Sequence, residues 1–177
     1  MIYGERVRLR APERSDLSQF VEWFNDPEVR EGILMILPLS LAREEKWFDD
    51  MIKKPEEEQV LVIEIELEEK WIVIGTCGFF GFDWRCRSAE VGIVIGEKTY
   101  WSQGYGTETM RMMLNHGFDS LNLNRIALDV YDSNHRAIRA YEKAGFIREG
   151  LKRRGMFKDG RYIDIIMMSV LRSEWKE

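Results

Sequence analysis

The stretch from Glu90 to Leu121 constrains the fold most, because it joins a strand pattern, a glycine loop and a helix pattern. Residues Glu90–Ile95 form an apolar, strand-like run, and Gln103-Gly104-Tyr105-Gly106-Thr107-Glu108 follows shortly after it. From Thr107 to Leu121, apolar side chains recur at helical spacing. Free backbone N–H groups and the positive end of a helix dipole meet at such a loop. The stretch therefore predicts an anion-binding site at the start of a helix.

The remaining patterns predict an α/β (α+β) fold with a mixed sheet, in the order β-α-α-β-β-β-α-β-α-β-β. The predicted hairpin of 61–67 and 71–82 requires antiparallel pairing, whereas strands that alternate with helices late in the chain require some parallel pairing. Residues 32–39 are apolar but aperiodic and are expected to form a loop. The other strands are expected at 6–10, 90–95, 125–131, 146–153 and 162–171, and the helices at 17–24, 41–52, 107–121 and 135–144.

Length, charge and cysteine usage narrow the functional class. With 177 residues, one domain over 1–177 is expected. A net charge of −5 disfavours nucleic-acid binding, which usually needs a basic excess. Cys77 and Cys86 form no C-x-x-C pair, and His116 and His135 have no metal-ligand spacing, so no metal site is predicted. No apolar run reaches the ~20 residues of a membrane span, and we expect a cytoplasmic protein.

The glycine loop does not match the two common nucleotide motifs. The dinucleotide fingerprint G-x-G-x-x-G needs a third glycine, and Thr109 stands at that place. The nucleotide-hydrolase loop needs G-K-[ST] after a strand, and the sequence has no such tripeptide. The remaining hypothesis is a loop that binds a pyrophosphate through backbone N–H groups, without a lysine or a metal ion.

The block Tyr100–Glu108 resembles the acetyl-CoA loop of the GNAT superfamily of N-acetyltransferases. It is most similar to the branch that contains ribosomal-protein N-terminal acetyltransferases and bacterial spermidine acetyltransferases. Four further blocks agree in the right order, and together they span nearly the whole chain: Gly4–Arg10, Trp23–Val29, Asn134–Phe146 and Asp164–Trp175. The pattern departs at Trp101, where the superfamily commonly has Gln or Arg.

The resemblance implies a GNAT fold with acetyl-CoA as co-substrate and no metal. It places the thioester and pantetheine along Ile93–Ile95 and the pyrophosphate on Gln103–Thr107. The residues that it implies for acetyl-CoA binding are Ile93, Val94, Ile95, Trp101, Ser102, Gln103, Gly104, Tyr105, Gly106, Thr107, Glu108, Asn134, Tyr141 and Lys143.

The resemblance also implies roles in catalysis. Tyr141 is the candidate general acid for the leaving thiolate, although a packed core tyrosine is the plainer reading. Glu90 is the candidate base, through a water molecule, and Asp26, Glu28 and Glu31 are the alternatives. Neither cysteine lies in a nucleophile context and no Ser/His/Asp set is present, so direct attack by the acceptor amine is expected.

The acceptor is less constrained by sequence than the donor. A protein N-terminal amine is the first expectation, a polyamine or other small amine is the alternative, and a non-catalytic CoA-binding module is the rival of another class. Residues 31–39 and the turn at Lys158-Asp159 are expected to shape the acceptor pocket. A homodimer is a further expectation from the resembling branch, and no nucleic-acid or membrane partner is expected.

Overall fold

The computed structural model describes residues 1–175, so the last two residues of the predicted 1–177 domain lie outside the described residues. Eight strands form one sheet in the order β1-β2-β3-β4-β5-β6-β8-β7. The strands are β1 Ile2–Tyr3, β2 Val7–Arg10, β3 Leu61–Leu67, β4 Lys70–Asp83, β5 Ser88–Ile95, β6 Arg125–Tyr131, β7 Ile147–Lys158 and β8 Arg161–Leu171. Neighbouring strands are antiparallel except β5 and β6, which are parallel, so the mixed sheet predicted from sequence is confirmed.

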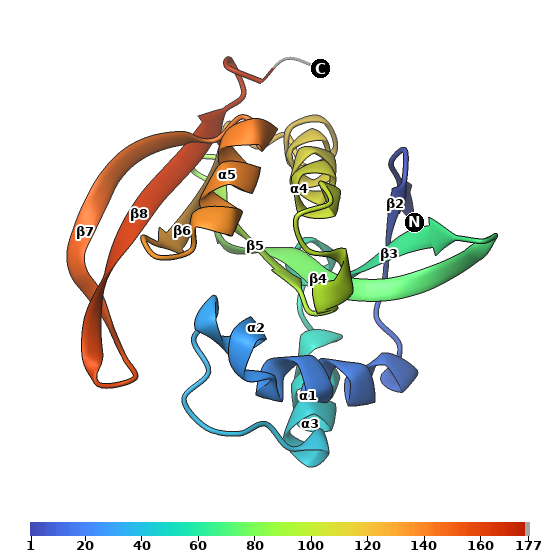
Figure 1. Cartoon of the computed structure of the whole chain (residues 1–177). Coiled ribbons are helices and arrows are strands. Elements are labelled where there is room, and N and C mark those ends of the chain that lie inside the picture. Colours follow the sequence, from blue (N-terminus) through green and yellow to red (C-terminus); the bar gives the residue numbers. More distant parts are fainter. Residues whose placement is uncertain (176–177) are drawn as a thin grey trace.

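Helices lie on both sides of this sheet: α4 and α5 on one side, and α1, α2 and α3 on the other (Figure 1). Their bounds are α1 Leu17–Asn25, α2 Pro27–Glu31, α3 Leu41–Met51, α4 Tyr105–Asn115 and α5 His135–Ala144. The Asn134 side chain caps α5 by accepting a hydrogen bond from Ala137 N at 3.2 Å. Gly145, at φ 113°, ends that helix in the left-handed conformation that glycine adopts without strain.

Two apolar layers hold the helices to the sheet. Met110, Met113 and Leu114 of α4 are buried against the sheet in the larger core. Leu17 and Phe20 of α1 are buried in a second, smaller cluster on the other side. Apolar burial of this kind contributes roughly 25 cal/mol per Å² of area removed from water. The two layers therefore fix α1 and α4 relative to the strands between them.

The parallel pair β5 and β6 separates soon after it begins. Its ladder contains only three pairs: Ser88 with Arg125, Ala89 with Ile126 and Glu90 with Ala127. Strand β6 stays paired with β8 along its whole length, from Arg125 to Tyr131. Beyond Glu90, the edges of β5 and β6 that face each other are not joined by ladder hydrogen bonds. An opening therefore forms in the sheet between these two strands.

The predicted element order omits two elements, β1 and α2. The first helix ends at Asn25, as expected from Asn25-Asp26-Pro27, but Pro27 also begins α2, because proline at the first turn of a helix loses no hydrogen bond. Asp26 caps α2, since its Oδ1 accepts from Glu28 N at 2.9 Å and from Val29 N at 3.2 Å.

The helix after the glycine loop was also placed slightly wrongly. It begins at Tyr105 rather than Thr107, and a π-helical turn over His116–Ser120 follows Asn115. The tyrosine belongs to the helix because Gly104 takes the left-handed conformation directly before it.

Candidate functional site

A cavity of about 930 Å³ occupies the opening between β5 and β6. Most of the predicted site residues line it: Glu90, Ile93, Val94, Ile95, Trp101, Ser102, Gly104, Tyr105, Gly106, Thr107, Asn134, Tyr141 and Lys143. The sheet edge, the glycine loop and α5 thus contribute to the wall of one cavity. Gln103 and Glu108 do not line the cavity.

The glycine loop presents main-chain donors at the start of α4. Gly104 is the N-cap at φ 91°, and no side chain caps the first N–H groups of the helix. Ser102, at φ 61°, also takes a left-handed conformation that is uncommon for a residue with a side chain. Uncapped N–H groups and the positive helix dipole favour an anion at this point, so the loop fits the pyrophosphate of CoA.

The two predicted residues outside the cavity have structural contacts instead. The Glu108 carboxylate accepts hydrogen bonds from Arg6 N at 2.7 Å and Val7 N at 3.1 Å, and it pairs with the Arg6 guanidinium at 3.0 Å. The Gln103 side chain donates to Thr99 O at 2.7 Å. Glu108 therefore ties α4 to β2, and Gln103 braces the loop from within. Their roles in acetyl-CoA binding stay predictions.

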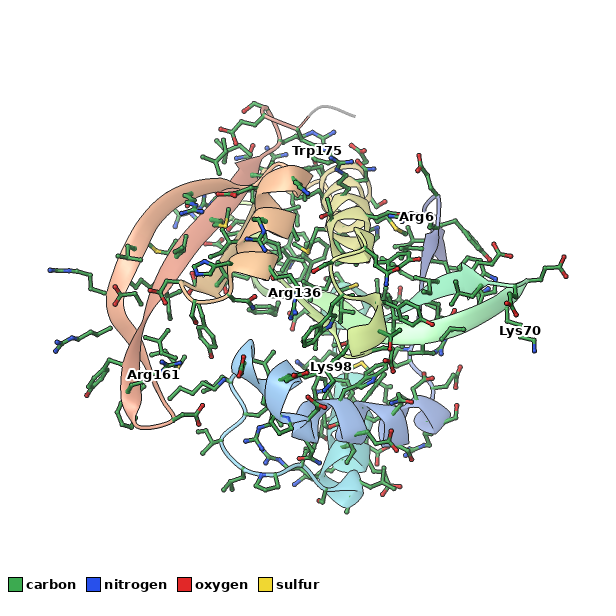
Figure 2. All side chains as sticks on the ribbon, viewed as in Figure 1. Arg6, Lys70, Lys98, Arg136, Arg161 and Trp175 are labelled. Atoms are coloured by element: carbon green, nitrogen blue, oxygen red, sulfur yellow. The ribbon has the colours of Figure 1, made fainter. Side chains whose placement is uncertain are left out.

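Trp101 closes the cavity where β5 ends. Its Nε1 donates to Ile95 O at 2.7 Å, and the Arg136 guanidinium carbon lies 3.4 Å from the centre of the indole ring. Arg136 lies at the middle of the molecule, on the first turn of α5 (Figure 2). The indole thus supports a cation beside the glycine loop, which is a different use from the Gln or Arg common at this position.

Three cations of α5 line the cavity, namely Arg136, Arg139 and Lys143. Only Lys143 was anticipated, although spacings of three and four residues place all three on one helix face. Helical spacing applied to charged residues would have found the other two. These side chains suit the phosphate groups of CoA, for which arginine is a preferred partner.

Tyr141 lies in the cavity wall, with its ring 6.0 Å from that of Phe146. Burial raises the pKa of Tyr141 to about 12. Its hydroxyl group has no hydrogen-bond partner within residues 1–175. The phenol therefore keeps its proton at neutral pH and is free to donate it. Its position is compatible with both hypotheses, a packed core residue and a general acid, since the ring packs against Phe146 and the side chain borders the cavity.

Glu90 stands at the last ladder pair before β5 and β6 separate. Its side chain is exposed, lines the cavity and lies beside Gly81, in the irregular part of β4. A carboxylate at the apex of the opening can reach the reacting amine through water. Its role as base stays a prediction.

The alternative bases are engaged elsewhere. Lys98 Nζ lies 2.8 Å from Asp26 Oδ2 and 2.8 Å from Glu28 Oε2. The hydrogen bond from Lys98 lowers the pKa of Asp26 below its ordinary value, which makes this carboxylate a weaker base. Glu31 does not line the cavity formed by the described residues. The geometry favours Glu90 among the four carboxylates.

The opposite part of the cavity wall comes from segments far apart in sequence. Its residues include Gly32, Ile33 and Leu34 after α2, Glu58 and Val60 before β3, Tyr131 of β6 and Met156 of β7. Glu58 and Glu90 form no ion pair with any residue in 1–175, whereas Asp129, also in the wall, pairs with Lys152 at 2.6 Å. Lys54 lines the cavity as well, but one ammonium group cannot neutralise both free carboxylates.

Within residues 1–175, no group of three or more His, Cys, Asp or Glu side chains could hold a metal ion. In the same part of the chain, no helix combines the length and the apolar character that a membrane crossing requires.

Comparison with known proteins agrees with this geometry. Residues 6–147 match the family model described as acetyltransferase (GNAT) domain. An uncharacterized N-acetyltransferase, p20 of Bacillus licheniformis, is 33% identical over 98% of this chain and 97% of its own length. YdaF of Bacillus subtilis, designated a candidate ribosomal N-acetyltransferase, is 32% identical over 51% of this chain and 49% of its own. The crystal structure of spermidine N-acetyltransferase from Vibrio cholerae with CoA and spermine superposes with a TM-score of 0.87. It is 27% identical and covers 97% of this chain and 98% of that one.

Proposed function

The chain belongs to the GNAT family of acetyltransferases, and we propose that its acceptor is a primary amine of a small polycation of the polyamine type. It is an N-acetyltransferase that uses acetyl-CoA as donor. The protein N-terminal amine, expected first from sequence, becomes the second candidate. A cytoplasmic location and a homodimer stay predictions.

One observation carries the proposed acceptor: two carboxylates, Glu58 and Glu90, line the cavity without an ion-pair partner in the described chain. Cations gather on α5, next to the loop that suits the pyrophosphate, while these carboxylates come from other elements. A cavity with opposite charges in its two parts suits an anionic donor and a cationic acceptor. The resemblance in fold to a spermidine N-acetyltransferase supports the same choice.

The proposed mechanism assigns a separate task to each group. The main chain of β5 and the start of α4 hold the donor, which supplies an activated acetyl thioester. Glu90 takes a proton from the acceptor ammonium through water, and the neutral amine attacks the thioester carbonyl. As the N–C bond forms and the C–S bond breaks, Tyr141 gives its proton to the sulfur. A proton lost from the amine later restores the phenol.

A competition between acceptors tests this function. Wild-type protein is incubated with acetyl-CoA and with equal concentrations of spermidine, n-butylamine and a short peptide with a free N-terminus. Mass spectrometry then identifies the acetylated products. We expect acetylated spermidine to exceed acetylated butylamine by about tenfold or more, because Glu58 binds the second charge while Glu90 serves the reacting amine. Equal yields from spermidine and n-butylamine would contradict the proposed preference for a polycationic acceptor.

The peptide in that mixture tests the second candidate. The similarity to YdaF favours this acceptor, and a wide cavity leaves room for an extended chain. Predominant acetylation of the peptide would establish it and displace the polyamine. Acetyl-CoA binding without any acetylated product would instead identify a non-catalytic CoA-binding module.

A further inference from the structure

The side chain of Lys158, at the end of β7, is enclosed by main-chain oxygens of a distant segment. Its Nζ donates to the carbonyl groups of Arg30, of Glu31 at 3.1 Å and of Ile33 at 2.9 Å. The same Nζ lies 5.3 Å from the ring centre of Tyr131. Three carbonyl groups and an aromatic face are a full set of partners for an ammonium ion. More than 120 residues of chain separate Lys158 from this segment.

These carbonyl groups belong to the end of α2 and the residues after it, where the helical hydrogen-bond pattern ends. Gly32 N donates to Val29 O at 3.3 Å and Ile33 N donates to Arg30 O at 3.3 Å, so the segment turns tightly as it leaves the helix. The last carbonyl groups of a helix carry partial negative charge, and a cation placed there is stabilising. Lys158 therefore does for α2 what a C-terminal cap does, but it comes from another part of the fold.

The segment that Lys158 holds is also part of the cavity wall. Gly32, Ile33 and Leu34 line the cavity, and so do Tyr131 beneath the ammonium group and Met156 two residues before Lys158. Figure 1 shows α2 facing the long β7–β8 hairpin across this side of the molecule. The contact made by Lys158 thus joins the segment after α2 to the β7–β8 hairpin, and both contribute residues to the cavity wall.

Helix α2 is held at its other end by Lys98, through the ion pairs to Asp26 and Glu28. Lys98 precedes the glycine loop, and Figure 2 places it beside α2. Its ammonium group bonds carboxylate side chains, whereas that of Lys158 bonds the main chain itself. Of these two contacts, only that of Lys158 bonds the backbone directly after α2. Further along the segment, Arg30 donates to Met35 O at 2.6 Å and the Asn25 side chain bonds the main chain of Leu39.

We propose that Lys158 is a positioning residue for the acceptor: it latches residues 30–33 to the β7–β8 hairpin and so sets the acceptor side of the cavity. The inference rests on the proposed transfer to an amine, since it specifies which wall that amine meets. Lys158 itself transfers no proton and touches neither substrate. Its removal releases the wall and weakens acceptor binding, while the glycine loop and its donor site keep their geometry.

The first test compares Lys158→Met with wild type by steady-state kinetics on spermidine and acetyl-CoA. Methionine keeps the length of the side chain but lacks the donors. We expect the acceptor KM to rise about tenfold, as a misplaced wall costs orientation, while the KM for acetyl-CoA stays within about twofold. Lys158→Arg, which keeps donors for the carbonyl groups, should recover part of the loss. Lys70→Met, at the far tip of the β3–β4 hairpin in Figure 2, is the matched control and should match wild type.

The second test needs no activity and so separates the latch from the proposed function. Hydrogen exchange of the Gly32 and Ile33 amides is followed in folded Lys158→Met and in wild type. Faster exchange at these amides, with unchanged exchange in α4, is the expected result. Unchanged exchange there, or an unchanged acceptor KM, would overturn the latch. Absence of transfer to every amine by wild type, with faster exchange in the variant, would reject the proposed function alone.

Discussion

The two halves of the cavity are built in different ways. The half proposed to bind the donor, called the donor half below, consists of the end of β5, the glycine loop and the start of α4, which follow one another within residues 93–115. Main-chain groups provide its binding surface, and regular secondary structure fixes them. The half proposed to bind the acceptor, called the acceptor half below, joins residues 32–34, Glu58, Val60, Tyr131 and Met156, which only tertiary contacts bring together. A half built from one continuous stretch can be predicted from sequence patterns. A half assembled from distant segments depends on tertiary contacts that no local pattern indicates.

The difference has a chemical counterpart. Pyrophosphate and pantetheine are invariant parts of one donor, and a backbone cradle serves them whatever the side chains are. In the proposed function, the acceptor amine is instead recognised by side chains, Glu58 and Glu90, and by the shape of a wall that Lys158 holds in place. The donor half can therefore be common to many relatives while the acceptor half differs between them. The predictions below separate the halves, from the largest effect to the smallest.

Tyr141 lines the cavity and is the proposed proton donor to the leaving thiolate. In Tyr141→Phe we expect kcat to fall about a hundredfold with little change in the KM for acetyl-CoA, because only the proton donor is lost. Steady-state kinetics measures both. With a pKa of about 12, the wild-type phenol stays protonated at neutral and mildly alkaline pH, so its ionisation removes no activity there. Tyr3→Phe, on exposed β1, is the control. An unchanged kcat in Tyr141→Phe would leave only the packing role.

Gly104 tests the donor half. Its φ of 91° lies in a region where a β-branched side chain costs about 1–2 kcal/mol, and the strain disturbs the N–H groups that face the phosphates. We expect Gly104→Val to raise the KM for acetyl-CoA about thirtyfold and to leave that for the acceptor nearly unchanged. Gly160→Val is a matched control, since Gly160 is at φ 77° in the β7–β8 turn with open space around it. Similar effects from both would mean that strain, rather than the phosphate cradle, is being measured.

Glu44 tests the helices that support the acceptor half. It is 4% exposed on α3, and burial raises its pKa to about 7. The folded state therefore binds this proton more tightly than the unfolded state, and the carboxyl group destabilises the fold increasingly as pH rises from about 4.5 through about 7. Glu44→Gln should raise the free energy of unfolding by about 1 kcal/mol near pH 8, after allowance for screening by water, and much less near pH 4.5. Urea unfolding at the two pH values measures the difference; an equal change at both would contradict the assignment.

Lys98 provides the smallest expected effect. Its ion pairs with Asp26 and Glu28 are solvent-exposed, and exposed pairs contribute little. Lys98→Met should therefore change either KM by less than about threefold, in contrast with Lys158→Met. A change in the acceptor KM as large as that of Lys158→Met would show that both ends of α2 matter equally to the wall.

The donor half was largely predictable because its signals are local. A strand, two glycines and a helix pattern lie within one stretch, and thirteen of the predicted residues prove to line one cavity. The sequence could not reveal that Glu108 would be taken by Arg6 and Val7, since that contact spans about a hundred residues. For the same reason it did not reveal Arg136 on the Trp101 ring.

The acceptor half was predicted only in outline. Residues 31–39 and the turn at Lys158 were both expected near the acceptor, but nothing in the sequence indicated that one would bind the other. Helix α2 was missed because proline at position 27 is compatible with two structures. It ends a helix that precedes it, and it can also begin a helix that follows. Asp26 at the preceding position, whose side chain caps α2, was the signal that decides between them.

The separation of the two halves is tested most directly by calorimetric titration of acetyl-CoA into wild type, Gly104→Val and Lys158→Met. The account predicts that Lys158→Met binds acetyl-CoA as wild type does, whereas Gly104→Val binds it about thirtyfold more weakly. Weakened binding in Lys158→Met to the extent seen in Gly104→Val, or undiminished binding in both, would contradict it.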